Sequence, residues 1–149
     1  MTQEPSYLLG RPNVTVRAFV EYTQRPGEYF MVFASWCDCW TLPGGRPEGA
    51  EPVEAVLNRE LKEELGVNPR TMRFLGFGQG AQYGESIKCA PPKIHLIYHA
   101  TVDKEPMIQD PENTQGKYVT LREIASMVQK EDGIDDFLKR FPDALEKNR

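Results

Sequence analysis

The sequence contains little that would export the chain, anchor it or cross-link it. No run of about 18 apolar residues occurs, and residues 1–14 lack a charged segment followed by an apolar one, so neither a membrane span nor a secretory signal is expected. The three cysteines, Cys37, Cys39 and Cys89, are odd in number and lack the spacing of a disulfide framework. These absences predict a cytoplasmic protein without a membrane partner.

Excess positive charge, internal repeats and low-complexity tracts are also missing. The formal net charge is -4 at pH 7, which argues against a nucleic-acid partner and means that a polyanionic ligand would need local cations or metal ions. A chain of 149 residues with 40% hydrophobic composition is long enough for one domain with its own core. We therefore expect a single domain over residues 1–149.

The hydrophobic pattern predicts a chain of mixed strands and helices. Strands are expected at residues 14–22, 28–35, 73–79, 93–102 and 117–120. The Gly- and Pro-rich segments 40–52 and 80–92 are expected to be loops. Helices are expected at 52–65, ended by Gly66, at 121–130, opened by a Thr120 and Glu123 capping box, and at 133–141.

The helix expected at residues 52–65 carries an unusual distribution of charge. On a wheel of about 100° per residue, Glu60, Glu63 and Glu64 fall in the arc of the apolar side chains, which are Val53, Val56, Leu57 and Leu61. Carboxylates at this spacing repel by a few tenths of a kcal/mol. An ordinary solvated face is the common explanation of a Glu-rich helix, but this cluster is expected to point inward or toward a cleft. Clustered carboxylate oxygens suit a hard cation such as Mg²⁺.

The residues around this helix match a longer pattern, G-x5-E-x7-R-E-U-x-E-E-x-G-U with U a bulky aliphatic, from Gly45 to Val67. This pattern resembles the complete Nudix box. The resemblance implies an α+β fold, an α/β/α sandwich with a mixed sheet between helices. It also implies a Mg²⁺- or Mn²⁺-dependent pyrophosphohydrolase acting on a nucleoside diphosphate linked to another moiety.

Roles within the box follow by position from the resemblance. Glu60 and Glu64 correspond to the main metal carboxylates, and Gly45 to a ligand through its backbone carbonyl. Glu63 corresponds to a further ligand, direct or through water, or to a general base. Glu51 and Arg59 correspond to an ion pair that ties the loop to the helix.

A general base outside the box is also compatible with the resemblance. In several relatives the base lies on a loop before the last strand, where Asp110 and Glu112 are the candidates here. Many relatives have a Glu close before an aromatic residue at that point, whereas this chain has Lys117 and Tyr118. The base therefore stays unassigned among Glu63, Asp110 and Glu112.

Candidate substrate contacts comprise cations for the phosphates and aromatic rings for a base. Arg46, beside the box glycine, is the first candidate cation, followed by Arg17, Lys88 and Lys93. A solvated surface position is the ordinary alternative for each of them. Trp40 and Tyr83 are candidates for stacking on a nucleobase, and packing in the core is the ordinary alternative for Trp40.

The resemblance narrows the substrate only partly. The Pro-Gly-Gly at 43–45 is usual among relatives that act on nucleoside triphosphates or nucleotide sugars, and we expect a nucleoside or deoxynucleoside triphosphate first. Tyr83, about sixteen residues beyond the box, is associated with diadenosine polyphosphate hydrolases. Where ADP-ribose hydrolases have a Pro, this chain has Gln82. A homodimer is compatible with this class of protein.

Two other functions compete with hydrolysis. A Nudix-fold module that binds or senses a nucleotide without turnover would be expected to lack one or more metal glutamates, and none is missing here. A zinc site made from Cys37, Cys39, His95 and His99 is disfavoured because strong zinc patterns place their cysteines farther apart. His95 and His99 share a strand face with Ile97, which predicts partly buried structural histidines.

Overall fold

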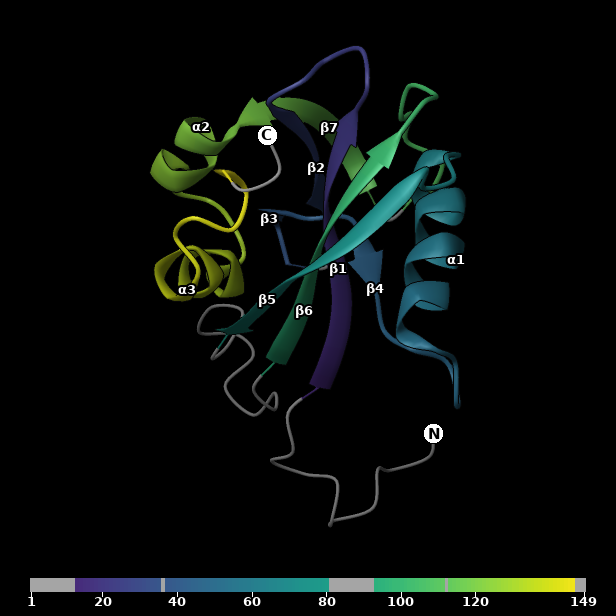
Figure 1. The fold of residues 1–149 in the computed structure, drawn as a ribbon, viewed down its shortest axis with the longest axis horizontal. Helices are drawn as coiled ribbons and strands as arrows, with labels where there is room; N and C mark the ends of the chain where they lie inside the picture. The colour runs from purple at the N-terminus through teal and green to yellow at the C-terminus, as the bar shows by residue number, and fades with distance from the viewer. Residues whose placement is uncertain (1–12, 36, 81–92, 112, 147–149) are drawn as a thin grey trace.

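The computed structural model describes residues 13–35, 37–80, 93–111 and 113–146, which form a mixed seven-stranded sheet with helices on both faces (Figure 1). The strands are β1 (Asn13–Tyr22), β2 (Glu28–Ala34), β3 (Cys39–Thr41), β4 (Gly44–Gly45), β5 (Thr71–Gly80), β6 (Lys93–Val102) and β7 (Asn113–Thr120). The helices are α1 (Val53–Leu65), α2 (Leu121–Ser126) and α3 (Asp132–Arg140). None of these helices is long and apolar enough to cross a membrane.

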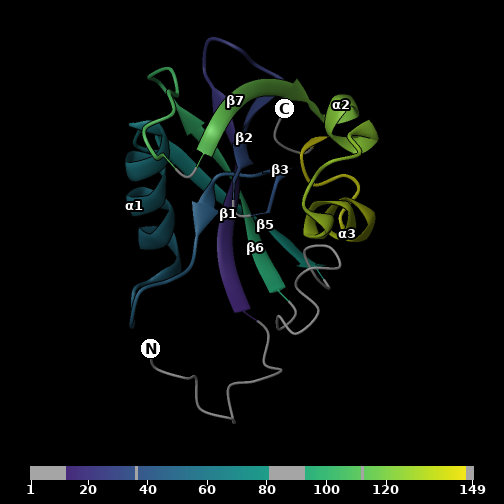
Figure 2. The same ribbon diagram turned by 180° about the vertical axis from the view of Figure 1, so that it is seen from behind.

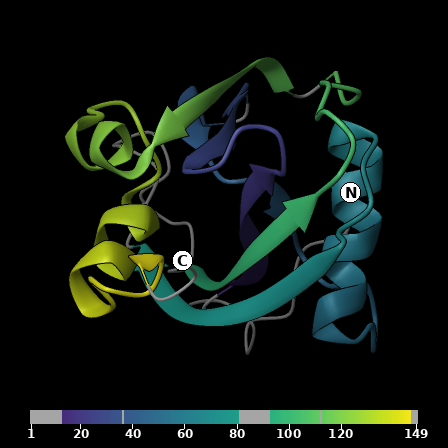
Figure 3. The same cartoon turned by 45° about the horizontal axis from the view of Figure 1, so that its top comes forward.

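The sheet has the order β3-β2-β1-β6-β5, with β4 paired to β1 and β7 paired to β2. The central strands β1 and β6 run parallel, and the other pairs are antiparallel. Helix α1 covers one face, whereas α2 and α3 lie on the other (Figures 1 and 3). The predicted α/β/α arrangement of a mixed sheet between helices is confirmed.

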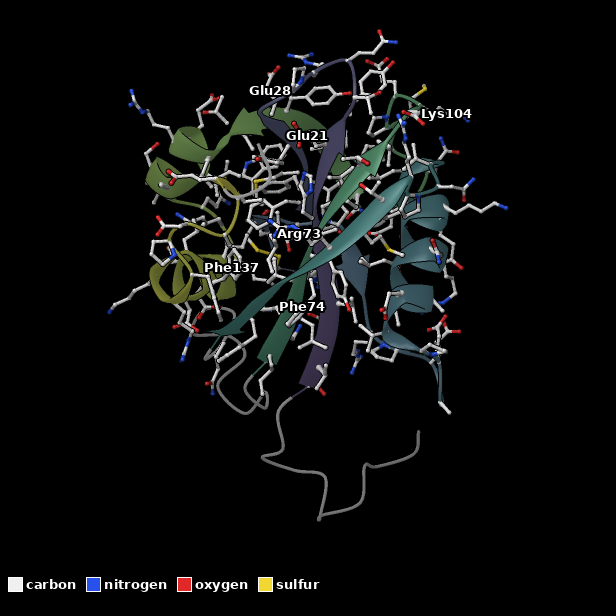
Figure 4. All side chains as sticks on the ribbon, in the orientation of Figure 1. Glu21, Glu28, Arg73, Phe74, Lys104 and Phe137 are labelled. Atoms are coloured by element: carbon white, nitrogen blue, oxygen red, sulfur yellow. A yellow bond between two sulfur atoms is a disulfide. The ribbon has the colours of Figure 1, made fainter. Side chains whose placement is uncertain are left out.

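Two hydrophobic cores form because successive side chains of a strand point to opposite faces. On the α1 side, the core joins alternate residues of β1 to the buried stripe of the helix, which comprises Val16, Ala18, Val20, Val56, Leu57, Leu61 and Leu65. On the other side, Phe19 of β1 packs against Phe137 of α3, with ring centroids 5.7 Å apart. Phe137 is labelled in Figure 4. Each fully buried large side chain contributes roughly 1.5–3 kcal/mol.

Local signals at the helix ends behave as predicted. Gly66 adopts the left-handed conformation with φ 69°, and its N–H donates to the Lys62 carbonyl at 3.0 Å, which ends α1. At the start of α2, the Glu123 N–H donates to the Thr120 hydroxyl at 3.2 Å and the Thr120 N–H donates to the Glu123 carboxylate at 2.9 Å. The capping box is therefore confirmed.

Element boundaries differ from the prediction where strands pair over long distances. The segment expected as a loop at 40–52 contains the end of β3 and the two-residue strand β4, and the last strand begins at Asn113 rather than at 117. Helix α2 ends at Ser126 rather than at 130. Pairing with β1 and β2 supplies the hydrogen bonds of β4 and β7, and a local sequence pattern does not show such partners.

The cysteines also differ from the prediction, because their spacing did not indicate a disulfide. The structure joins Cys37 and Cys39 in a disulfide, with the two Cα atoms 5.3 Å apart. Asp38 between them has φ 53°, in the left-handed region that Asp adopts more readily than most residues. The turn between β2 and β3 therefore brings together two cysteines whose spacing fits no disulfide framework.

Two glycine substitutions test how closely β4 approaches β1. A Cβ on Gly44 would overlap the Val16 carbonyl, and Gly44 has φ 147°, whereas Gly49 has φ 57° with open space around it. We expect Gly44→Ala to lower the free energy of unfolding by at least about 3 kcal/mol, because steric overlap adds to backbone strain. Gly49→Ala is the matched control and should cost about 1 kcal/mol. Urea denaturation measures both; equal losses would contradict the close approach.

Candidate functional site

Helix α1 meets the sheet across β4, which lies between α1 and β1 (Figure 2). Gly44 pairs with Arg17 of β1, and a Cβ added to Gly45 would overlap the Glu60 carboxylate. At Gly44 the neighbours are backbone atoms of Val16 and Arg17, so only a glycine permits this approach, whereas at Gly45 the neighbour is the end of the flexible Glu60 side chain. The two glycines therefore place a backbone strand directly against the acidic side of α1.

A cavity of about 620 Å³ opens at this junction. Its lining combines carboxylates with cations and small polar groups. The lining residues are Thr15, Arg17, Thr41, Gly44, Gly45, Arg46, Pro47, Glu48, Glu60, Glu64, Lys93, Asp110 and Asn113. A volume of this size suits a small-molecule ligand.

Glu64 is the most buried acidic residue of the cavity, with 6% of its surface exposed. One carboxylate oxygen accepts the Gly44 N–H at 3.0 Å and the other accepts the Asn113 side-chain amide at 3.1 Å. Burial raises the pKa of Glu64 to about 7, although the Arg17 charge and both hydrogen bonds oppose this rise. The protein thus holds a costly negative charge at the wall of the cavity.

Arg59 binds carboxylates both on helix α1 and on the loop that precedes it. Its guanidinium donates to Glu51 at 2.9 and 3.0 Å and to Glu60 at 2.8 Å, and also to the Arg46 carbonyl at 3.1 Å. The predicted tie between the loop and the helix is present as this Glu51–Arg59 pair. The hydrogen bond from Arg59 lowers the pKa of Glu51, whereas burial raises the pKa of Glu60 despite the same guanidinium.

Glu63 lies differently from the wheel prediction. Its side chain is 60% exposed, 3.7 Å from Arg59, and it is absent from the cavity lining, unlike Glu60 and Glu64. The apolar stripe that packs on the sheet is narrower than the arc drawn on the wheel, so an offset of about 60° leaves Glu63 in solvent. The prediction that all three glutamates point inward or toward a cleft is therefore wrong for Glu63.

The donor set fits a hard cation through two carboxylates. Across the described ranges, no three His, Cys, Asp or Glu side chains are grouped to hold a metal ion. Mg²⁺ usually takes one or two protein carboxylates and keeps several waters. Glu60 and Glu64 line one cavity, and burial raises the pKa of both, so their ionised forms would gain from a nearby cation.

The candidate cations are brought together in the cavity. Arg17 is buried and donates to the carbonyls of Leu42 and Gly44 at 3.2 and 3.3 Å. Arg46 is exposed, and Lys93 is partly buried, which lowers the pKa of its ammonium group to about 8. Lys88 lies outside the described residues.

Of the two aromatic candidates, Trp40 is the one that the structure describes. Trp40 packs edge to face on Phe33, with centroids 5.3 Å apart, and against the core on the α3 side. It is absent from the cavity lining, so the structure shows Trp40 in a packing role. Tyr83, like the candidate base Glu112, lies outside the described residues. Asp110, the other base candidate on that loop, lines the cavity.

Sequence reasoning missed Asn113, Thr15 and Thr41 at the cavity. Each is buried and polar, and each lies on a strand. No motif contains them, because their positions depend on which strands become neighbours. The available signal was that Asn113 follows the two base candidates, Asp110 and Glu112, closely in the sequence.

Both histidines are buried, and more deeply than the partial burial predicted from the sequence. His95 is hydrogen-bonded to the Thr15 hydroxyl, and His99 to the Glu21 carboxylate at 2.7 Å. Burial lowers the pKa of His95 to about 4. With Cys37 and Cys39 bonded to each other, the residues of the zinc alternative do not form a site.

The sandwich and its acidic helix define the Nudix class of hydrolases. The NUDIX domain family model matches residues 12–141. The chain therefore belongs to the NUDIX family, and the prediction of a Nudix hydrolase is confirmed.

Solved structures share this fold. A MutT NUDIX hydrolase from Burkholderia pseudomallei is 21% identical with a TM-score of 0.69, over 85% of this chain and 96% of that one. A MutT protein from Methanosarcina mazei is 21% identical with a TM-score of 0.75, over 95% and 99%. The NUDIX domain of Shewanella oneidensis NrtR, complexed with ADP ribose, is 18% identical with a TM-score of 0.69, over 98% and 94%. A search of curated proteins found no match.

The raised pKa of Glu64 predicts that removing its charge stabilises the metal-free protein. Folding raises this pKa from 4.5 to about 7, so the folded state binds the proton more tightly and loses stability as the pH rises through about 7. We expect the change in the free energy of unfolding on Glu64→Gln to be more favourable near pH 8 than near pH 5 by roughly 2 kcal/mol. The comparison between the two pH values cancels the constant cost of placing the Gln amide group opposite the Gly44 and Asn113 donors.

Urea denaturation in EDTA at both pH values measures this difference. The matched control is Glu54→Gln on the exposed side of α1, which makes the same chemical change away from the cavity. An equal gain for Glu64→Gln at both pH values would show that the buried charge is not its source.

Proposed function

We propose that this protein is a metal-dependent pyrophosphohydrolase that cleaves the diphosphate linkage of a nucleoside diphosphate derivative. The observation that carries the proposal is that Glu60 and Glu64 line the same cavity as Arg17, Arg46 and Lys93. Carboxylates alone would repel a pyrophosphate, and cations alone would not hold a metal. Both kinds of group together suit a phosphate chain that binds with a divalent ion.

Glu60, Glu64 and the backbone carbonyl of Gly45 would hold Mg²⁺ or Mn²⁺. When bound, such an ion neutralises phosphate oxygens and lowers the pKa of a coordinated water. Arg59 already binds Glu60 at 2.8 Å, which orients this carboxylate beside Gly45. Glu64 is oriented by its hydrogen bonds from Gly44 and Asn113.

The chain's other charged groups would bind the phosphates and accept the proton. Buried Arg17 and partly buried Lys93 would contact phosphate oxygens within the cavity, and exposed Arg46 would do so beside Gly45. Glu63 is proposed as a ligand through water or as the general base, which requires rotation of its exposed side chain, a fast motion at a surface. Asp110, which lines the cavity, is the alternative base, and Glu112 stays a candidate from the sequence.

Nucleoside and deoxynucleoside triphosphates are our first substrate class, on the basis of the Pro-Gly-Gly at 43–45. Dinucleoside polyphosphates and nucleotide sugars are the next candidates. ADP ribose belongs in the same test, because the structurally similar NrtR domain was solved with it. A module that binds nucleotides without turnover is the second candidate, and the complete set of box glutamates disfavours it.

A nucleotide panel tests the proposal directly. We expect Mg²⁺-dependent release of a phosphate-containing product from at least one nucleoside diphosphate derivative, with products identified by chromatography and mass spectrometry. Glu64→Gln should lower kcat at least about a hundredfold while the protein stays folded. Glu54→Gln should retain wild-type kcat. Absence of any Mg²⁺-dependent product, or full activity of Glu64→Gln, would refute the proposal.

Glu63 should contribute less than its neighbours, because it is exposed and lies outside the cavity lining. We expect Glu63→Gln to lower kcat by a smaller factor than Glu60→Gln or Glu64→Gln. Mn²⁺ binding, measured by electron paramagnetic resonance, separates the two roles of Glu63. A loss of kcat with unchanged Mn²⁺ affinity indicates the base, and a joint loss indicates a ligand. A fall in kcat larger than that of both neighbours would contradict the ranking.

A further inference from the structure

Asn113 joins the start of β7 to helix α1, two elements that are far apart in the sequence. Its side-chain amide donates to one Glu64 carboxylate oxygen at 3.1 Å, and only 6% of its surface is exposed. We propose that Asn113 is a positioning residue that fixes the Glu64 carboxylate for metal binding. This inference rests on the function proposed above and assigns a residue that lies outside the Nudix box.

A β-bulge aims Asn113 at the cavity. Strand β7 pairs with β2 so that Gln115 lies opposite Phe33 and Asn113 lies opposite Ala34. Two residues of β7 therefore advance for one residue of β2, and Thr114 is the extra residue. Bulges of this kind redirect a side chain and are frequent beside active sites. Asn113 is buried, whereas Thr114 and Gln115 are exposed.

The backbone around Asn113 is also held. Its N–H donates to the Asp110 carbonyl at 3.1 Å, which closes the turn that leads into β7. Strand β7 begins on the α1 side of the sheet and ends at α2 (Figures 2 and 3). The amide group of Asn113 is thus attached to a fixed strand end rather than to a freely moving loop tip.

Two donors from different strands define the orientation of Glu64. Gly44 of β4 donates its backbone N–H to one oxygen at 3.0 Å, and Asn113 of β7 donates to the other. Each carboxylate oxygen has two acceptor positions, and the hydrogen bonds made by the described residues take one on each, so a second position on each oxygen can face a cation. The Gly44 donor belongs to the backbone, which leaves Asn113 as the donor that a side-chain substitution can remove.

Two substitutions separate positioning from packing. Asn113→Ala removes the donor and leaves space, whereas Asn113→Leu removes the donor and fills a similar volume. A packing role would be restored by Leu, and a positioning role would not. Gln115→Ala is the matched control, because Gln115 is exposed on the same strand. Thermal unfolding of each metal-free protein first verifies that it is folded.

The test measures Mn²⁺ binding to nucleotide-free protein by electron paramagnetic resonance, together with the Mg²⁺ concentration for half-maximal turnover. We expect both Asn113 variants to bind Mn²⁺ about tenfold more weakly than wild type, as is typical when an outer partner of a metal ligand is lost. The Mg²⁺ requirement should rise by a similar factor. The nucleotide KM at saturating Mg²⁺ should stay within about twofold, and Gln115→Ala should match wild type.

The outcomes distinguish this inference from the proposed function. Wild-type Mn²⁺ affinity in both Asn113 variants, or restored affinity in Asn113→Leu, would overturn the positioning role while leaving the hydrolase intact. A wild-type protein that neither binds Mn²⁺ nor hydrolyses any nucleotide would overturn the proposed function, and the positioning role with it.

Discussion

The buried carboxylate of Glu64 links the elements that surround the cavity. Glu64 accepts hydrogen bonds from Gly44 and Asn113, so helix α1 and the strands β4 and β7 converge on a single side chain. Desolvation makes an ionised group costly at such a position, and the pKa of about 7 reports that cost. The ionised Glu64 therefore lowers the free energy of unfolding at the position where a cation would be bound, and such a loss of stability is common at functional sites.

The repulsion within the acidic helix is relieved inside the helix itself. Arg59 lies within 4 Å of Glu48, Glu51, Glu60 and Glu63. Exposed ion pairs contribute little individually, but Arg59 and Glu51 are largely covered and hydrogen-bonded twice. The guanidinium therefore holds the loop after β4 against α1 and keeps Glu60 next to Gly45. Repulsion among the glutamates of α1 does not by itself indicate a metal site. The cavity lined by Glu60 and Glu64 is the stronger indication.

The helix ends, the capping box and the family could all be predicted from the sequence. These features depend on residues within a few positions of one another. They are helix α1, its end at Gly66, and the capping box of Thr120 and Glu123. The Nudix box is likewise contiguous from Gly45 to Val67, so the acidic pair and its glycine strand could be anticipated. The α/β/α architecture followed from the resemblance carried by that box.

Strand pairing and packing determine which polar groups lie together at the cavity. Asn113 is aimed by a bulge against β2, and Arg17 is brought to the cavity by the pairing of β1 with β4. The exposure of Glu63 depends on how narrow a stripe of α1 packs on the sheet, which a helical wheel does not specify. The helix ends, the box and the family could be predicted from residues that lie close together in the chain. Strand pairing and packing, which act between residues far apart in the chain, determined the rest.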